Sequence, residues 1–284
     1  LFGQDNNDWY AAIALAETII RGQNPENIKL VDSTLVTDAH ENQKMRFILM
    51  NPPFGQSWSK DKIGEEQFNK IIEHNTKPNG WYVAGLPQSG DMQLLFWQFA
   101  LNKLQDNGRA AIICNAAPLF SGNAKSGESN IRKWLFEKDY VEAIIRFCPE
   151  LFYNTGISIY AFIFNKKKSS QRKGKIQLIN AQDLFKRMSK GLGYKRNELT
   201  NDHIEQIVKL YTDFTENENC IIYEKEDFYY KEVPCYQPFQ RSFKISKLGI
   251  ENLIGVNAFK KIYDEDDYSA LDEMPKKTQA QVEK

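Results

Sequence analysis

The sequence predicts an α/β domain built around an open, mostly parallel sheet. Short apolar runs of strand length alternate with amphipathic segments of helical period along most of the chain. One such run, Phe47 to Met50, ends abruptly in Asn-Pro-Pro-Phe-Gly at 51–55, and a run of this kind suits a parallel strand covered on both faces. The chain has 284 residues, of which 42% are hydrophobic, so it can bury one sizeable core.

The chain opens in what reads as the end of a strand that closes at Asp5. Asn6 or Asn7 can cap a following helix, which we expect to run to about Gly22, because glycine suits a left-handed stop. A second short strand, 28–31, follows and leads into Asp32. The helix carries an apolar face that we expect to pack on a sheet, formed by Ala12, Leu15, Ala16, Ile19 and Ile20.

Residues 56–90 are rich in Gly, Asn, Gln and Ser and predict a long, irregular loop. Such a loop either closes over a bound substrate or is a mobile insertion, and the sequence leaves both interpretations open. His74 lies in this segment, isolated from the other two histidines, so no metal site is predicted. A helix is predicted from Asp91 to Asn107, with Gly108 as its stop. Its buried stripe is Leu94, Trp97, Leu101 and Leu104.

The alternation continues through a strand at 110–114, an amphipathic helix around Ile131 and two strands at 141–147 and 157–164. We expect the second of these strands to form a hairpin with a strand at 175–180, with the turn at 165–175. Thr200 can cap the next helix. Its buried face is predicted to be Ile204, Ile207, Val208 and Tyr211.

Charge and cysteine content exclude several classes of protein. The formal net charge is zero, but residues 165–196 hold eleven Lys or Arg residues and one acid, Asp183. Such a segment either contacts phosphates or only keeps an exposed surface soluble. The four cysteines are widely spaced and are expected to be reduced thiols. The sequence contains neither a signal-peptide pattern nor an apolar run of membrane-spanning length, so a cytoplasmic protein is expected, with no membrane partner.

The corner at 51–54 carries the most specific chemistry. Each proline fixes its own φ and restricts the residue before it, so the carbonyl groups of Asn51 and Pro52 should be held in one orientation. The Asn51 amide offers an acceptor and a donor, and Phe54 offers a flat apolar face. Together these groups suit a planar ring that bears an amino group.

This motif resembles the signature of methyltransferases that transfer a methyl group from S-adenosylmethionine to the exocyclic amino group of adenine in DNA. Across roughly residues 1–215, the order and spacing of further landmarks resemble the modification (M) subunit of type I restriction-modification systems. The landmarks lie at 3–5, 31–35, 51–55, 108–111, 131–135, 155–158 and 195–199.

The resemblance implies a Rossmann-like methyltransferase sheet, mostly parallel, with an antiparallel hairpin near its C-terminal end. It implies that catalysis depends on Asn51, Pro52, Pro53 and Phe54. Asp5 ends a strand, where a carboxylate can accept both ribose hydroxyls of a nucleoside cofactor; its alternative role is a simple helix cap. Asp32 lies where the family contacts the adenine of the cofactor, S-adenosylmethionine. No metal is implied.

The family also implies that a helical domain, a strand and a glycine-rich cofactor loop precede Leu1, so this chain is expected to be truncated. Gly191-Leu192-Gly193 is the only Gly-x-Gly, and it follows a polar segment expected to be helical, which excludes it as a displaced cofactor loop. Three parts are expected: a partial catalytic domain at 1–215, a small helical or irregular extension at 216–263 that contacts another subunit, and a disordered acidic tail at 264–284.

Three functions remain open from the sequence. The first is the adenine-methylating M subunit of a type I system, which acts on double-stranded DNA with a specificity (S) subunit and a restriction (R) subunit. The second is a non-catalytic binding or assembly module, arising from truncation or divergence. The third is a stand-alone adenine methyltransferase. If the first function applies, this fragment by itself is expected to be inactive.

Overall fold

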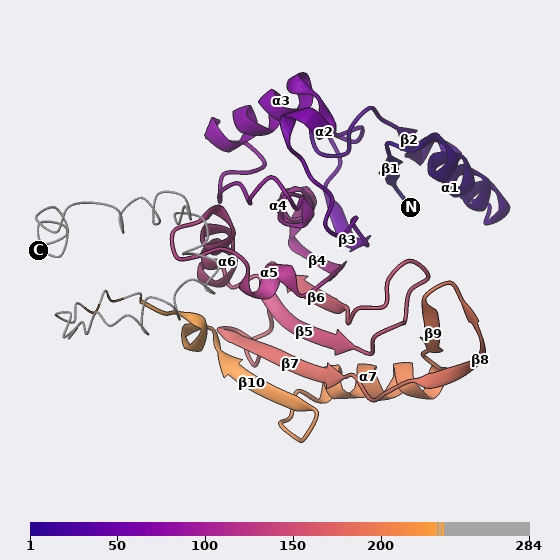
Figure 1. The fold of residues 1–284 in the computed structure, drawn as a ribbon, viewed down its shortest axis with the longest axis vertical. Helices are drawn as coiled ribbons and strands as arrows, with labels where there is room; N and C mark the ends of the chain where they lie inside the picture. Colours follow the sequence, from indigo (N-terminus) through magenta and orange to yellow (C-terminus); the bar gives the residue numbers. More distant parts are fainter. Residues whose placement is uncertain (232, 234, 236–284) are drawn as a thin grey trace, which may run out of the picture. The chain divides into compact units, whose positions relative to one another are not determined.

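A computed structural model describes residues 1–231, 233 and 235 of the chain. The chain divides into two compact units, Leu1–Glu232 and Val233–Lys284, and all the helices and strands named below belong to the first unit (Figure 1). Most of the expected extension at 216–263 and all of the expected disordered tail at 264–284 lie outside the described residues.

A six-stranded sheet with the order β10-β7-β5-β6-β4-β3 forms the centre of this unit (Figure 1). Four strands, β3, β4, β5 and β7, run in one direction, and β6 and β10 run in the other. The predicted α/β class with a mostly parallel sheet is therefore confirmed. The strands are β3 Met45–Met50, β4 Leu104–Cys114, β5 Val141–Phe147, β6 Tyr160–Asn165, β7 Lys175–Ala181 and β10 Cys220–Glu224.

The predicted strand, helix and strand at the start of the chain are present. The short strands β1 (Gly3–Asp5) and β2 (Ile28–Leu30) pair in parallel as a separate sheet, and α1 (Asp8–Ile20) and a 3-10 turn (Pro25–Asn27) connect them. The side chain of Asn7 accepts a hydrogen bond from the Tyr10 amide as the helix cap, and Gly22 has φ 65° just beyond the helix end.

Two expectations about apolar faces are wrong. On α1 the buried residues are Ala11 and Thr18, whereas Ile19 is 57% exposed. Strand β3 is not covered on both faces, because Phe47 and Leu49, which share one face of the strand, are 68% and 85% exposed. The spacing of apolar residues shows that one face of a helix or strand is suited to burial. Whether another element packs on that face depends on other parts of the chain.

The prediction of an irregular loop at 56–90 is also wrong. This segment contains α2 (Lys60–Ile63) and α3 (Glu65–Thr76). Its aromatic residues and α3 form a hydrophobic cluster with α4 (Gln93–Lys103). Fully or nearly fully buried members of this cluster are Trp58, Ile71, Tyr82 and Leu95. The polar composition masked the helix, since Ile71 is the only buried residue of α3.

The predicted buried stripe is confirmed: Leu94, Trp97 and Leu101 of α4 and Leu104, directly after it, are each at most 3% exposed. The helix ends at Lys103 rather than at Asn107, because β4 already begins at Leu104, which pairs with Met45 of β3. The Asn107-Gly108 pair favours a helix end at 107, but pairing of this segment with β3 ends the helix earlier.

Beyond β4, the chain forms α5 (Ala117–Phe120) and α6 (Gly127–Glu137), and α6 buries Ile131 as predicted. The predicted pairing of the strand at 157–164 with the strand at 175–180 is wrong, since β5 lies between β6 and β7. The consecutive antiparallel pair is instead β5 with β6, and β7 pairs in parallel with the other side of β5. Residues 166–174 therefore pass across one end of β5.

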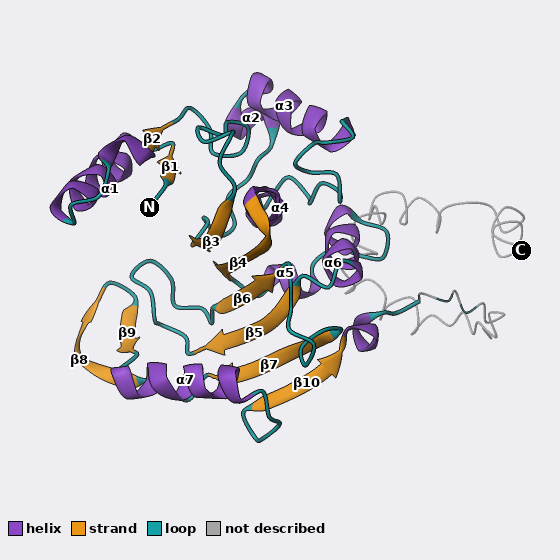
Figure 2. Cartoon of the chain, turned by 180° about the vertical axis from the view of Figure 1, so that it is seen from behind, coloured by secondary structure: helices purple, strands orange, loops and turns teal. Residues whose placement is uncertain are grey.

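The C-terminal part of the unit contains a small hairpin, a helix and the last strand. Strands β8 (Lys186–Leu192) and β9 (Lys195–Glu198) pair as an antiparallel hairpin, so Gly191 lies in a strand and not after a helix. Helix α7 (Asn201–Asp213), capped by Thr200 as predicted, runs along β7 (Figure 2). It buries Ile207, but Ile204 and Val208 are 46% and 52% exposed, so half of its predicted buried face is wrong.

Strand β10 and a 3-10 turn (Lys225–Phe228) follow residue 215. Because β10 pairs with β7, the predicted boundary at 215/216 falls inside the first compact unit, ahead of an edge strand of its sheet. The division into parts at 1–215, 216–263 and 264–284 stays a prediction.

Candidate functional site

The carboxyl ends of β1, β2 and β3 open onto one cavity of about 930 Å³. Asp5 ends β1, Asp32 lies two residues beyond β2, and Asn51 directly follows β3. All three line the cavity, together with Pro52 and Pro53. The structure thus brings five of the six predicted site residues to one hollow. Phe54 is half-buried and is not among the residues that line it.

Asn51 is exposed, and its side chain makes no hydrogen bond to any residue that the structure describes. The residue before it, Met50, pairs with Ile112 of β4, so the sheet fixes the start of the corner. Pro52 is buried and Pro53 is half-buried. The corner therefore presents a carboxamide with both its donor and its acceptor free.

The chain after the corner is fastened to residues 88–92. The Met92 amide donates to the Gln56 carbonyl at 3.0 Å, and the Trp58 amide donates to the Ser89 carbonyl at 2.9 Å. The indole of Trp58 is buried, stacks on Phe68 and donates to the Gln88 carbonyl. These contacts fix the segment that directly follows the corner, so this segment is not a mobile loop.

Asp5 is not the helix cap, because Asn7 occupies that role. One carboxylate oxygen of Asp5, Oδ1, accepts the Asn7 amide at 2.8 Å. No hydrogen bond to a described residue involves its other oxygen. Asp32 is exposed. The two carboxylates therefore keep acceptor oxygens for a ligand, although only Asp5 is also held by the backbone.

The loop between β2 and β3 is anchored by a buried ion pair that was not predicted from the sequence. Lys103 Nζ lies 2.6 Å from Asp38 Oδ2 and donates to the His40 carbonyl at 2.7 Å. The side chains of Lys103 and Asp38 are 10% and 8% exposed. The available signal was a lysine on a helix that is otherwise buried on all sides, because such a cation requires a partner.

Further contacts fix the same loop on both sides. The Gln4 side chain of β1 donates to the Thr37 carbonyl at 2.8 Å and accepts from the Ala39 amide at 3.0 Å. The Tyr82 hydroxyl donates to the Leu35 carbonyl. Burial raises the pKa of Tyr82 well above its usual range, so the hydroxyl keeps its proton and remains a donor. This loop is therefore held to both β1 and α4, and several of its residues line the cavity.

The cavity wall combines these polar groups with an apolar side. Helix α4 contributes Phe96 and Phe99, Met92 directly precedes that helix, and β3 contributes Ile48 and Leu49. Flat ring systems with polar edges suit such a surface, because the rings are covered by apolar side chains while the few polar groups fix orientation. Among the described residues, no group of three or more His, Cys, Asp or Glu side chains is arranged to hold a metal ion. No helix in this part of the chain has the length and hydropathy needed to cross a membrane.

Residues 1–233 match the model of a protein family described as N-6 DNA Methylase. Among individual relatives, the methylase subunit of the type I restriction enzyme MjaIX from Methanocaldococcus jannaschii is 27% identical over 220 residues, covering 77% of this chain and 37% of that protein. The MjaVII methylase subunit from the same organism is 30% identical over 228 residues, covering 77% of this chain and 36% of the relative. The chain thus spans little more than a third of the length of these relatives.

Solved structures share the fold. The type I restriction-modification methyltransferase subunit from Streptococcus thermophilus superposes with a TM-score of 0.66 at 23% identity, covering 80% of this chain and 44% of that one. The M protein of the type I restriction enzyme EcoKI gives a TM-score of 0.53 at 20% identity, covering 74% of this chain and 40% of the other. This part of the chain therefore has the same fold as these two subunits.

Proposed function

The chain belongs to the N-6 DNA methylase family, and from this premise we propose that its cavity serves methyl transfer to the exocyclic amino group of adenine in DNA. One observation carries the proposal: the unpartnered carboxamide of Asn51, held on a proline corner, shares a cavity with the acceptor carboxylates of Asp5 and Asp32. An acceptor for an amino group and acceptors for a nucleoside thus face the same space.

The residues present fit S-adenosylmethionine as the cofactor. The cavity of about 930 Å³ lies in the range of small-molecule sites, and its apolar wall suits an adenine ring. The free oxygen of Asp5 would accept ribose hydroxyls, as carboxylates do at the ends of strands in nucleotide-binding sheets. Asp32 would accept from the adenine of the cofactor. When bound, the cofactor supplies the methyl group.

The corner would position the substrate. A paired and stacked adenine does not expose its amino group, so the base is turned out of the duplex and into the cavity. The side-chain oxygen of Asn51 and the carbonyl of Pro52 then accept the two amino hydrogens, which directs the nitrogen lone pair away from the ring. Phe54 would stack on the base. Alignment of this kind is worth on the order of 7 to 11 kcal/mol, so no general base or metal is needed.

The biological context proposed is the M subunit of a type I restriction-modification system. Its partners would be double-stranded DNA, a specificity (S) subunit that reads the DNA sequence, and a restriction (R) subunit. Support comes from the type I methylase subunits among the relatives. The second candidate is a non-catalytic assembly module. A stand-alone adenine methyltransferase is the third.

Methyl transfer tests the proposal directly. Isothermal titration measures S-adenosylmethionine binding to this chain and to a form extended upstream of Leu1, and transfer to duplex DNA is measured with and without the S subunit. We expect Asn51→Ala to lower transfer by about 100-fold or more in the form that binds cofactor, because the amino group loses its orientation. The matched control is Asn201→Ala at the first, exposed residue of α7.

The three candidates give different results. Transfer that requires the S subunit and is lost in Asn51→Ala supports the M subunit. Transfer to defined DNA without a partner supports a stand-alone enzyme. Absence of cofactor binding in both forms, with the fold intact by circular dichroism, would leave the assembly module and exclude catalysis.

A further inference from the structure

A second cavity, of about 630 Å³, lies at the other end of the strands. It is lined by Arg46 near the start of β3, by Arg109 and Glu142 of β4 and β5, by the segment that follows β6, and by the end of α7. Arg46 precedes Asn51 by five residues on an extended strand, which separates the two positions by roughly 16 Å along the sheet. This cavity is therefore distinct from the one at Asn51.

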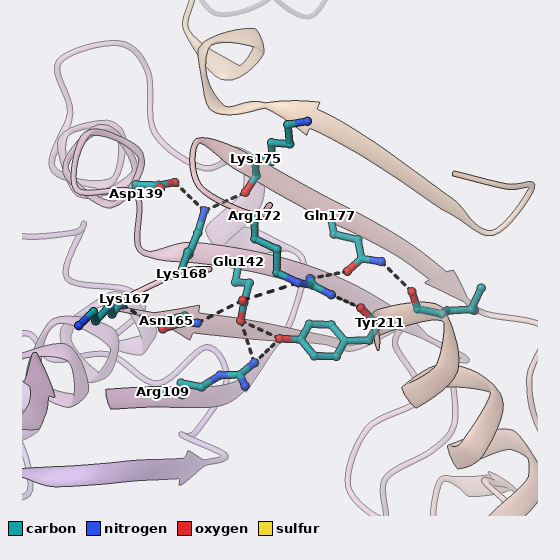
Figure 3. A network of polar contacts seen from close by, with 11 residues as sticks. Arg109, Asp139, Glu142, Asn165, Lys167, Lys168, Arg172, Lys175, Gln177 and Tyr211 are labelled. Atoms are coloured by element: carbon teal, nitrogen blue, oxygen red, sulfur yellow. Dashed lines mark hydrogen bonds and ion pairs between the residues drawn. The ribbon is translucent and has the colours of Figure 1, made fainter. Parts of the chain in front are cut away.

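Glu142 lines this cavity and is 3% exposed. Figure 3 shows the groups that converge on its carboxylate. Arg109 Nη2 lies 2.8 Å from Oε2, and the Tyr211 hydroxyl donates to the same oxygen at 2.7 Å. Asn165 Nδ2 donates to Oε1 at 3.1 Å, and Arg172 Nε lies 3.9 Å from that oxygen. The negative charge of Glu142 is thus fully satisfied within the protein.

The second acid of the network, the half-buried Asp139, is also fully occupied. Asp139 Oδ1 accepts from Lys168 Nζ at 2.6 Å, and Oδ2 accepts the Gly174 amide at 2.8 Å. Lys168 also donates to the Lys175 carbonyl (Figure 3). Its side chain is 2% exposed. Burial lowers the pKa of Lys168, and the adjacent Asp139 opposes this effect. The pair is a fixed part of the fold.

Cations exceed acids around the cavity. Its lining contains five cationic side chains: Arg46, Arg109, Lys167, Lys168 and Arg172. Glu142 and Asp139 neutralise two of these charges, so three positive charges remain. Lys167 is exposed, and its side chain has no acidic partner among the described residues. Such an excess, gathered in a concave site next to a low-dielectric interior, attracts an anion more strongly than the same charges spread over a surface.

The aromatic surface of the cavity is already covered, which limits the kind of anion. The Tyr211 ring lies under the guanidinium of Arg172 at 4.5 Å and that of Arg109 at 5.8 Å. Burial raises the pKa of Tyr211 to about 12, so the hydroxyl stays neutral and remains committed to Glu142. No open ring in the lining is left to stack on a base.

We propose that this cavity binds a phosphate group. The contacts would come from the free ammonium of Lys167, from the guanidinium of Arg46, and from the 39% exposed side chain of Arg109. Guanidinium and ammonium groups are the usual partners of phosphate oxygens, and the hydroxyl of Ser169 lies on the same segment as Lys167. The phosphate belongs either to a nucleic-acid backbone or to a free phosphate compound. The proposal does not depend on methyl transfer, because neither Asn51 nor the cofactor carboxylates line this cavity.

Titration of the full chain with inorganic phosphate, with ATP and with a short DNA duplex, each followed by calorimetry without S-adenosylmethionine, tests the proposal. We expect saturable binding of at least one probe and a loss of about tenfold or more in affinity in Lys167→Glu, which reverses the charge of the free cation. The matched control is Lys133→Glu on α6, whose side chain is 66% exposed and lies outside the cavity. It should bind as the unaltered chain does.

The arms also separate the two sources of the phosphate. Binding of inorganic phosphate or ATP that the duplex does not displace assigns a free phosphate compound, whereas competition by the duplex assigns the nucleic-acid backbone. The proposal is overturned if no probe binds saturably, or if Lys167→Glu and Lys133→Glu weaken binding to the same extent. Thermal unfolding of both variants checks that the fold is intact. If Lys167→Glu does not fold, the titration is repeated with Arg46→Ala, for which the same loss of affinity is expected.

Discussion

His74 has a structural role that could not be predicted from its residue type. Its ring stacks on Trp81 with the centroids 4.1 Å apart, and its Nδ1 is buried without a hydrogen-bond partner among the described residues. Burial lowers the pKa of His74, and the nearby Lys77 acts in the same direction. The isolation of this histidine in the sequence excluded a metal role but did not reveal that it packs against a tryptophan.

This pKa shift makes stability depend on pH. In the unfolded chain a histidine binds its proton near pH 6.5, whereas the folded chain resists protonation of His74 until lower pH. The unfolded state therefore binds more protons below about pH 6.5, and the free energy of unfolding should fall as the pH decreases through this range. Urea unfolding at pH 8, 7, 6 and 5.5 measures the effect. His74→Phe keeps a ring on Trp81 but cannot titrate, so it should flatten the fall.

The value at pH 8 gives the difference in packing between His74→Phe and the unaltered chain, because His74 is neutral there in both states. If the two proteins lose stability equally between pH 7 and 5.5, His74 does not contribute to the acid response.

The positions of the proposed site residues could be predicted from the sequence where covalent chemistry fixes the backbone, whereas their roles stay predictions. The prolines at 52 and 53 restrict the backbone whatever surrounds them, and Asp5 and Asn51 lie at the ends of strands that stop where predicted. Phe54 differs, because its contribution depends on the direction of a side chain. Its stacking on a substrate base stays a prediction, and in the structure it does not line the cavity.

At the scale of elements, the loop from β2 to β3 depends on one ion pair. Lys103 and Asp38 come from α4 and from that loop, 65 residues apart, and both side chains are nearly buried. The sequence marks Lys103 as a cation on an otherwise apolar helix, but it does not identify Asp38 as the partner. Only the tertiary arrangement brings them together, and it does so at the wall of the proposed cofactor cavity.

Removal of one partner of this pair should be costly. We expect Lys103→Met to lower the free energy of unfolding by about 3 to 5 kcal/mol, because Asp38 is left as a buried, unpaired charge. Guanidinium unfolding measures the change. Adding Asp38→Leu should recover most of the loss, since the two apolar residues no longer bury a charge.

Lys209→Met serves as the control, because Lys209 forms an ion pair with Asp213 on the surface of α7, where its side chain is 75% exposed. Its effect should stay within about 0.5 kcal/mol. A loss of that size in Lys103→Met would mean that the loop does not depend on the buried pair.

The sequence predicts helices in which many apolar residues recur at helical spacing, but it does not predict helices with few such residues. Helix α4 follows from its sequence because apolar residues recur at helical spacing on a long segment. Helix α3 was missed because most of its residues are polar, and it is held by Ile71 and by aromatic residues outside the helix. Helix α1 shows the converse case, since its large apolar residues lie exposed.

At the scale of the whole molecule, the sheet has an open apolar edge. Strand β3 pairs with β4 on one side and with no other described strand, and its Phe47 and Leu49 are 68% and 85% exposed. Unpaired backbone groups beside exposed apolar side chains accept a further strand, either from another chain or from a second copy.

We expect the isolated chain to self-associate through β3 in a concentration-dependent manner. Leu49→Lys should raise the dissociation constant by about tenfold or more, because a charge on an edge strand opposes strand pairing and the buried leucine area is lost. Sedimentation velocity over a concentration series measures the change.

The control is Ile204→Lys, which places the same charge at a 46% exposed apolar position on a helix. It should leave self-association unchanged. A monomer at all concentrations, or an equal effect of both variants, would exclude β3 as the contact.

By itself, the sequence determined the alternation of strands and helices, most strand positions, the caps at Asn7 and Thr200, and the proline corner, because spacing, capping chemistry and fixed dihedral angles act over a few residues. Only the tertiary structure decided the strand order, in which β5 separates β6 from β7. It also decided the helical cluster at 56–90, the Lys103–Asp38 pair and the cationic cavity around Glu142. These features join residues far apart in the chain, and their energies depend on which surfaces meet. Local sequence patterns do not show which of these surfaces pack together.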